Sequence, residues 1–229
     1  MLSSGPIETT PRSSVSHGNR AATEASPDLA LAWANLAVVL LINASQEMTL
    51  GEPPVGRAKA RCEEAVSALD RAEAIEGAGD ALSLNTRGNA LALLLRWEEA
   101  QKEYARAADV ARRDFESIPR SNLALVQFQL GALADAERTA NKLVRRDPGF
   151  RDGFALLAAL RLEQDDVAGA VRAFDGVCAG SDGGMWCNRY STEEVVMGRW
   201  TPRAVDSYRK LLKLDAIKRE IRNAQALTR

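Results

Sequence analysis

Histidine is almost absent from this sequence. The single residue, His17, lies in a segment rich in serine and threonine, where no pattern would fix its position. Histidine supplies many general bases and metal ligands, so triad and metal-site chemistry are nearly excluded. Paired carboxylates such as Glu98-Glu99 lie near helix starts, where acids complement the helix dipole, and no glycine-rich loop precedes a Lys-Ser or Lys-Thr pair. The sequence therefore predicts a non-enzymatic protein with no cofactor and no bound metal.

Cysteine is also scarce. Cys62, Cys178 and Cys187 are an odd number, at spacings that suit neither a disulfide framework nor a paired zinc motif. We therefore expect a reducing compartment. Cys62 and Cys178 lie among apolar helical positions and are predicted to be small buried hydrophobic residues. Without a histidine base nearby, none of the three is expected to act as a nucleophile.

Neither an excess of positive charge nor a long apolar run is present. The 30 basic residues are balanced by 31 acidic ones, so no general attraction to nucleic acid is expected. The longest apolar run, Leu36 to Ile42, falls short of the roughly 20 residues that cross a bilayer. This run is predicted to be a buried helix.

Helix-forming residues dominate the chain beyond Ser26. Alanine, leucine, glutamate and arginine are abundant, apolar residues recur three and four positions apart, and alternating β-branched runs are missing. Breaks carrying glycine, proline, asparagine or aspartate separate these segments. The pattern predicts a row of short helices with brief connections.

The same order of residues recurs along the chain. A segment that begins at Ser117 is repeated from Arg151, 34 residues later, and an earlier copy begins at Ala81, 36 residues before Ser117. A fourth, partial copy follows Pro27. A fixed period of roughly 20 to 50 residues is typical of stacked helical repeats. Small residues recur at Gly88, Ala100, Ala124, Ala136, Ala158 and Ala170, and aromatic residues at Trp33, Trp97, Tyr104, Phe154 and Phe174.

This order resembles the tetratricopeptide repeat, over about residues 27–184. The resemblance implies an all-α, right-handed solenoid of about four helix pairs, at about 27–77, 81–116, 117–150 and 151–184. Residues 1–26 are expected to be a disordered tail or the remnant of a transit peptide. Residues 185–229 form a basic C-terminal region, in which Thr201 as N-cap and Pro202 at the first helical position predict one capping helix over 201–227.

The resemblance also implies a binding surface, because the first helix of each tetratricopeptide repeat lines a concave groove. Asparagines there could donate to and accept from a peptide backbone, or could instead bond neighbouring helices. The implied function is a non-enzymatic scaffold that binds a protein or peptide; the alternative is a targeting or adaptor subunit of an enzyme or transport complex. The groove residues carried over are Asn35, Val38, Asn85, Asn89, Asn122, Leu125 and Phe128.

The C-terminal segment differs from the repeats in charge. From Arg199 to Arg229 it holds nine basic residues against three acids. This basic cap could contact an acidic protein, or it could contact an anionic membrane surface peripherally and work as a membrane tether. The alternative is that it is a solvated face of the capping helix. Its candidate residues are Arg209, Lys210, Lys213, Lys218 and Arg219.

A second resemblance concerns the same region. Trp186-Cys187-Asn188-Arg189-Tyr190, followed by Arg199-Trp200-Thr201-Pro202, looks like the tail of a tetratricopeptide group from cyanobacteria and chloroplasts, in which Cys-x-x-Tyr and Arg-Trp-Pro-Pro precede the last helix. Here Thr201 replaces the first proline. The resemblance implies a chloroplast protein that helps a multi-subunit complex assemble; otherwise a cytoplasmic location is expected. Packing under the cap would explain the aromatic residues equally well, and the oligomeric state stays open.

Overall fold

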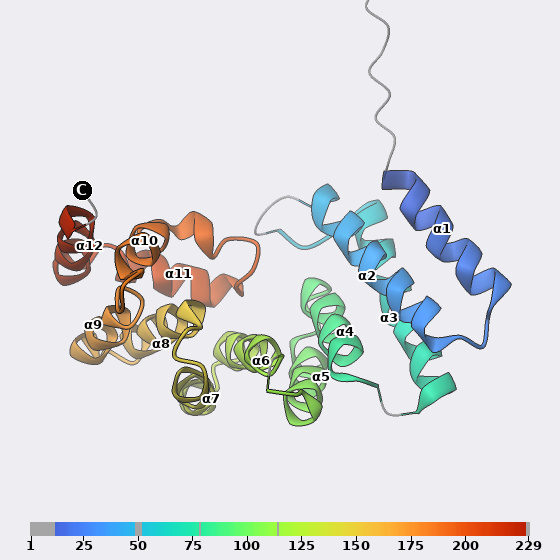
Figure 1. Ribbon diagram of the computed structural model, residues 1–229, viewed down its shortest axis with the longest axis horizontal. Coiled ribbons are helices and arrows are strands. Elements are labelled where there is room, and N and C mark those ends of the chain that lie inside the picture. The colour runs from blue at the N-terminus through green and yellow to red at the C-terminus, as the bar shows by residue number, and fades with distance from the viewer. Residues whose placement is uncertain (1–11, 49–51, 78, 114, 228–229) are drawn as a thin grey trace, which may run out of the picture. The chain divides into compact units, whose positions relative to one another are not determined.

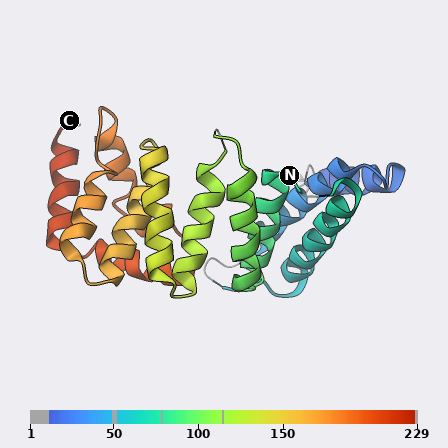
Figure 2. The same cartoon turned by 90° about the horizontal axis from the view of Figure 1, so that it is seen from below.

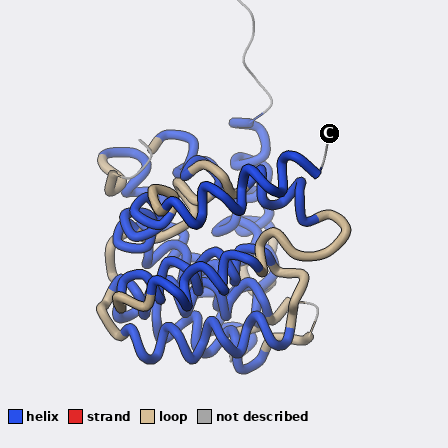
Figure 3. Tube along the Cα trace, turned by 90° about the vertical axis from the view of Figure 1, so that its left-hand side faces the viewer, coloured by secondary structure: helices blue, strands red, loops and turns tan. Residues whose placement is uncertain are grey.

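The computed structural model describes residues 12–48, 52–77, 79–113 and 115–227. Figure 3 shows helices joined by short loops, and no strand occurs within these ranges. The predicted all-α fold is confirmed. The chain divides into two compact units, the first holding helices α1 to α3 and the second α4 to α12, and each is described by itself.

The first unit contains α1 (Arg12–Ala25), α2 (Ala30–Glu47) and α3 (Gly56–Glu76), seen in Figure 1. The expectation of a disordered tail through Ser26 is wrong for residues 12–25, which form α1. This helix packs on α2, buries Thr23 and places Arg20 beside Glu64 of α3. Such tertiary contacts stabilise a helix that composition alone does not favour. Residues 1–11 lie outside the described part of the chain.

Three helix pairs follow in the second unit. They are α4 (Ala81–Leu93) with α5 (Trp97–Val110), α6 (Ser117–Gln129) with α7 (Leu133–Arg146), and α8 (Arg151–Glu163) with α9 (Val167–Asp175). Figure 2 shows the helices of this unit side by side in a row. The first helix of each pair begins at Ala81, Ser117 and Arg151, the residues that mark the sequence period.

The turn within each pair is built in the same way. Leu95, Gly131 and Asp165 all have left-handed backbone conformations, with φ of 60°, 79° and 60°. In each turn, the N–H of the next residue donates to a carbonyl five positions earlier at 2.9 Å, which closes the end of the first helix. Only Gly131 adopts this φ without a steric cost, so the closing hydrogen bond and the packed helices must hold Leu95 and Asp165 in it.

Small residues set the distance between paired helices. Ala100, Ala136 and Ala170 are completely buried. At Gly88, a Cβ atom would lie 2.5 Å from Cε1 of Tyr104, closer than side chains pack. These positions therefore let the second helix approach the first, and the ring of Tyr104 fills the space that the missing side chain leaves.

The C-terminal region contains α10 (Gly183–Arg189), a 3-10 turn (Glu193–Val195), α11 (Pro202–Leu211) and α12 (Asp215–Leu227). The single capping helix expected over 201–227 is therefore two helices. α11 packs on α8 and α6, whereas α12 packs on α10 and α9. The break after Leu211 lets Leu211 and Ile217, both fully buried, enter the core from two different helices.

Cys178 and Cys187 form a disulfide with a Cα–Cα distance of 4.6 Å. The expectation that the cysteines do not pair, and that Cys178 is a simple hydrophobic residue, is wrong. The turn between α9 and α10 reverses the chain and returns Cys187 to Cys178. Disulfides are typical of oxidising compartments, which weighs against the reducing one expected from the cysteine count. Cys62 is free and buried.

Reducing this disulfide is expected to destabilise the second unit. Replacing both Cys178 and Cys187 by serine should lower the free energy of unfolding by about 2 kcal/mol, because a short closed loop is released in the unfolded chain. Burial, aided by the charge of Glu63, raises the pKa of Cys62 to about 11, so its thiol should be inert in the folded protein. Thiol titration in denaturant should find one thiol before reduction and three after it. Three thiols without reduction would show that the disulfide is absent.

Candidate peptide-binding groove

The first helices α4, α6 and α8 form the face on which the groove was predicted, here called the inner face. Figure 1 shows α11 lying over α6 and α8, on the side away from α7. Three hydrogen bonds hold it there. Thr201 Oγ1 donates to the Leu125 carbonyl at 3.2 Å, Ser207 Oγ donates to the Ala159 carbonyl at 2.8 Å, and the Arg203 N–H donates to Gln129 Oε1 at 3.1 Å. The chain's own helix therefore occupies this part of the inner face.

The side chain of Arg203 strengthens the contact. Its Nε and Nη2 donate to Glu163 Oε1 at 3.2 and 3.1 Å, and its guanidinium lies 5.8 Å from the ring centre of Phe128. Leu125 and Phe128, two of the predicted groove residues, are buried. While α11 lies in this position, they contact the C-terminal segment of the same chain.

Asp152, in the first turn of α8, anchors the segment that leads into α11. Tyr190 Oη and Arg199 Nη2 donate to its Oδ1 at 2.8 and 2.9 Å, and Trp200 Nε1 donates to its Oδ2 at 3.0 Å. Tyr208 Oη donates to the Tyr190 carbonyl at 2.5 Å. Tyr190, Arg199 and Trp200 thus converge on one carboxylate, which the sequence analysis did not single out.

The electrostatics of this anchor keep its donors protonated. Burial raises the pKa of Tyr190 well above its ordinary value, and the charge of Asp152 raises it further. Burial likewise raises the pKa of Tyr208. Burial would lower the pKa of Arg199, but the charge and hydrogen bond of Asp152 outweigh it and raise the pKa overall. Both phenols and the guanidinium therefore remain donors at physiological pH.

The predicted groove asparagines form a cluster between α4 and α6. Asn122 Nδ2 donates to Oδ1 of Asn85 at 3.0 Å and of Asn89 at 3.4 Å, and Tyr104 Oη donates to Asn89 Oδ1 at 2.8 Å. These bonds join neighbouring helices, as the alternative interpretation anticipated. Asn85 itself is buried, at 5% exposure. The peptide-binding role remains a prediction.

Exposed apolar residues share faces with the cluster. Leu82 lies three positions before Asn85 on α4 and is 56% exposed, and Ile118 lies four positions before Asn122 on α6 and is 45% exposed. Residues at these spacings lie on one side of a helix. The start of the inner face therefore combines amide groups with two accessible apolar side chains.

The other predicted residues lie elsewhere. Asn35 and Val38 are on α2 of the first unit, where Asn35 is exposed and Val38 half-buried. Of the basic cap, Arg209 pairs with Glu193 and Asp206, and the hydrogen bond that it donates to Glu193 is the main cause of its raised pKa. Lys218 pairs with Asp215 at 3.5 Å. Within the described chain, three cap residues form no ion pair: Lys210, Lys213 and Arg219.

No group of three or more histidine, cysteine, aspartate or glutamate residues is placed to hold a metal ion in the described part of the chain. No described helix combines the length and hydrophobicity needed to traverse a bilayer.

This arrangement is that of a tetratricopeptide-repeat fold, and comparison with solved structures confirms it. The chain is 14% identical to MamA, covering 72% of this chain and 85% of that one with a TM-score of 0.60. It is 22% identical to pilF of Pseudomonas aeruginosa (94% and 90% covered, TM-score 0.57). It is 18% identical to YrrB, described as a TPR protein with an unusual peptide-binding site (72% and 75% covered, TM-score 0.54). No protein-family profile and no curated protein matches the chain.

Proposed function

We propose that this protein is a non-enzymatic scaffold that binds a protein or peptide ligand at the α4–α6 end of its inner face. The observation that carries the proposal is the asparagine cluster of Asn85, Asn89 and Asn122, flanked by the exposed Leu82 and Ile118. Amides can hydrogen-bond an extended backbone whatever its side chains, and apolar contacts add affinity. The peptide-binding site named for YrrB, a protein of the same fold, is in keeping with such a role.

The packing of α11 on the inner face supports the same proposal. Farther along the inner face, Thr201 and Ser207 already bind a segment to carbonyls of α6 and α8. A ligand at the α4–α6 part of this face would rest beside helices that α11 joins through these hydrogen bonds. Preorganised surfaces lose less entropy on binding.

The process that this scaffold serves is proposed from the C-terminal resemblance. Tyr190, Arg199 and Trp200, which match the cyanobacterial and chloroplast group, hold α11 on the stack through Asp152. This resemblance in sequence is the support for a plastid protein that assists the assembly of a multi-subunit complex. The partners captured from the native host test this assignment.

The test is affinity purification from the native host with two groove variants. Asn85→Asp keeps an oxygen that accepts from Asn122 but removes the amide donor, so the fold should persist while ligand binding weakens about tenfold. The triple change of Asn85, Asn89 and Asn122 to alanine should remove the same partners completely. Partners that include plastid or thylakoid proteins would support the assembly role.

Asn141→Ala provides the matched control, because Asn141 lies on the outer helix α7. It should retain every partner that the wild type captures. If both groove variants kept the wild-type partners at undiminished levels, the inner face would not be the binding surface. Melting temperatures of all variants would be compared first, so that loss of fold is not mistaken for loss of binding.

A further inference from the structure

A polar cavity of about 520 Å³ lies outside the inner face, between the start of α6 and the end of α7. Its charged lining comes from three parts of the chain: the segment after α5, the first turn of α6 and the last turn of α7. Among the described lining residues, four arginines face two carboxylates, so positive charge exceeds negative by two in this set. The charged residues are Arg113, Glu116, Arg120, Arg145, Arg146 and Asp147.

Arg120 is the buried arginine among the residues that line this cavity. It is only 7% exposed, and one of its terminal nitrogens pairs with Glu116, but its Nε is buried without a hydrogen-bond partner. Glu116 also pairs with Arg146. Burial alone would raise the pKa of Glu116, but the hydrogen bonds and charges of these two arginines lower it overall, so it stays ionised. A buried N–H without an acceptor is uncommon and indicates a missing partner.

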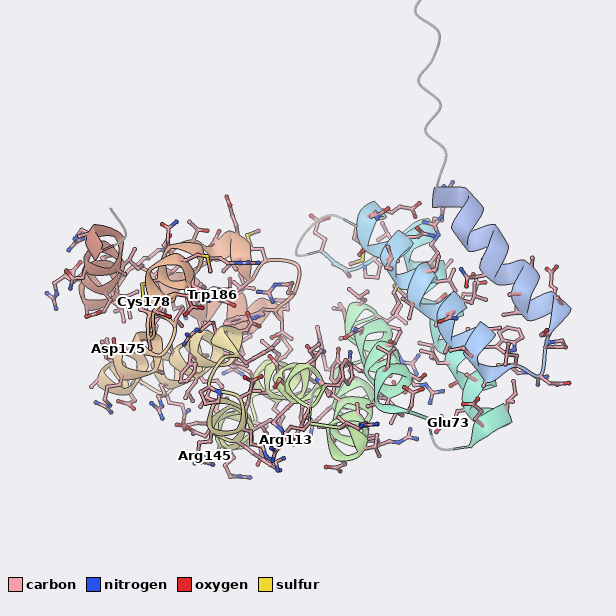
Figure 4. The ribbon with its side chains drawn as sticks, in the orientation of Figure 1. Glu73, Arg113, Arg145, Asp175, Cys178 and Trp186 are labelled. Carbon is pink, nitrogen blue, oxygen red and sulfur yellow. A yellow bond between two sulfur atoms is a disulfide. The ribbon has the colours of Figure 1, made fainter. Side chains whose placement is uncertain are left out.

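Two further arginines of the cavity carry positive charges that no described carboxylate pairs with. Arg113 and Arg145 are exposed, and neither forms an ion pair within the described chain. Figure 4 labels them near one another by α6 and α7, away from Trp186. In addition, α6 begins at the cavity without a side-chain cap on its first N–H groups, those of Ser117 and Ile118; Pro119, the third residue, has no N–H. Free N–H groups at a helix start favour an anion.

We propose that this cavity binds a phosphate monoester. The excess of two positive charges matches the dianion that a phosphate monoester carries near neutral pH. Arginine forks match phosphate oxygens in bidentate geometry, and the unpartnered Nε of Arg120 would gain an acceptor. The cavity is much larger than a phosphate group, so the phosphate enters as part of a larger molecule: a phosphorylated side chain or a small phosphorylated metabolite.

The test is calorimetric titration of the full chain with four probes: inorganic phosphate, a sugar phosphate, a phosphoserine peptide and the same peptide without phosphate. We expect at least one phosphorylated probe to bind and the unphosphorylated peptide not to. Binding should weaken about tenfold when Arg145 is changed to glutamine, and more when Arg113 is changed as well. Both residues are exposed, so these variants should fold. Tight binding of the peptide identifies a phosphoprotein source, whereas tight binding of a sugar phosphate alone identifies a metabolite.

Arg172→Gln is the control, because Arg172 is an exposed arginine in the last turn of α9, as Arg145 is in α7. It should bind like the wild type. Affinity should also fall as the pH is lowered from 7.5 to 5.5, because the phosphate becomes a monoanion with a second pKa of about 6 while Glu116 stays ionised. Equal loss in R172Q and R145Q, or no binding of any phosphorylated probe at millimolar concentration, would overturn the proposal. The groove variants leave this cavity intact, so the two proposals fail separately.

Discussion

Changing Asp152 to alanine is expected to lower the free energy of unfolding by about 3 kcal/mol, because two buried donors lose their acceptor together. Tyr190 and Trp200, each less than a tenth exposed, would keep an N–H or O–H with no partner, and Arg199 would lose its ion pair. Urea denaturation followed by tryptophan fluorescence measures the change. Hydrogen exchange across residues 190–211 should rise selectively, because this carboxylate ties that segment to α8.

The variant Asp152→Asn keeps the size of the side chain but removes its charge, so it separates the effect of the charge from that of the side chain's shape. Tyr190 and Arg199 use Oδ1, whereas Trp200 uses Oδ2, so an amide could accept on one side only and would present a donor to the other. Asp152→Asn should therefore fall between the wild type and Asp152→Ala. Asp175→Ala, at an exposed position at the end of α9, should change stability by less than about 0.5 kcal/mol. If Asp152→Ala behaved like Asp175→Ala, the C-terminal segment would not depend on this carboxylate.

The C-terminal segment therefore works as part of the repeat stack as well as a cap on it. α11 covers Leu125 and Phe128 of the predicted groove, and α12 packs against α9 and α10 near the end of the unit. One consequence is that, within the second unit, the part of the inner face that α11 leaves uncovered is confined to α4 and the start of α6. Another is that Lys210 on α11 and Lys213, in the turn after α11, are exposed beside a helix whose other side is fixed.

The repeat fold could be predicted from the sequence because its signals are local. A small residue, a turn and a second small residue recur at spacings that fix where paired helices touch, and α4, α6 and α8 begin where the period was read. The turns needed no glycine in each copy: Leu95 and Asp165 adopt the conformation that Gly131 adopts easily. Recurrence identified turns that no single residue would have indicated.

The anchor at Asp152 and the disulfide could not be predicted because the residues that form them come together only when the chain folds. Asp152 lies 38 residues from Tyr190 and 48 from Trp200, and no periodic pattern connects them. The sequence does contain one signal for the anchor. Tyr190, Arg199 and Trp200 are three hydrogen-bond donors within eleven residues, and such donors need an acceptor when they are buried. Cys178 and Cys187 lie nine residues apart, and only the reversal of the chain between α9 and α10 brings them into contact.

Changing Tyr208 to alanine is expected to have the largest effect of any single change proposed, about 4 kcal/mol of lost stability. Tyr208 is completely buried, packs edge-on against Trp200 with 5.3 Å between ring centres, and donates to the Tyr190 carbonyl. Removing the ring leaves a cavity between α11 and the stack as well as an unpaired carbonyl. Denaturation curves of the full chain give the magnitude.

Phenylalanine at position 208 resolves the two contributions. It keeps the ring and its contact with Trp200 and loses only the hydroxyl, so Tyr208→Phe should cost about 1 kcal/mol. Met185→Ala, which removes a large side chain that is 60% exposed on α10, should be nearly neutral. If α11 is packed into the core, the free energy of unfolding should fall far more in Tyr208→Ala than in Tyr208→Phe, and it should not change in Met185→Ala. Similar stabilities for all three variants would mean that α11 contributes little to the fold and that the inner face beneath it is open to a ligand.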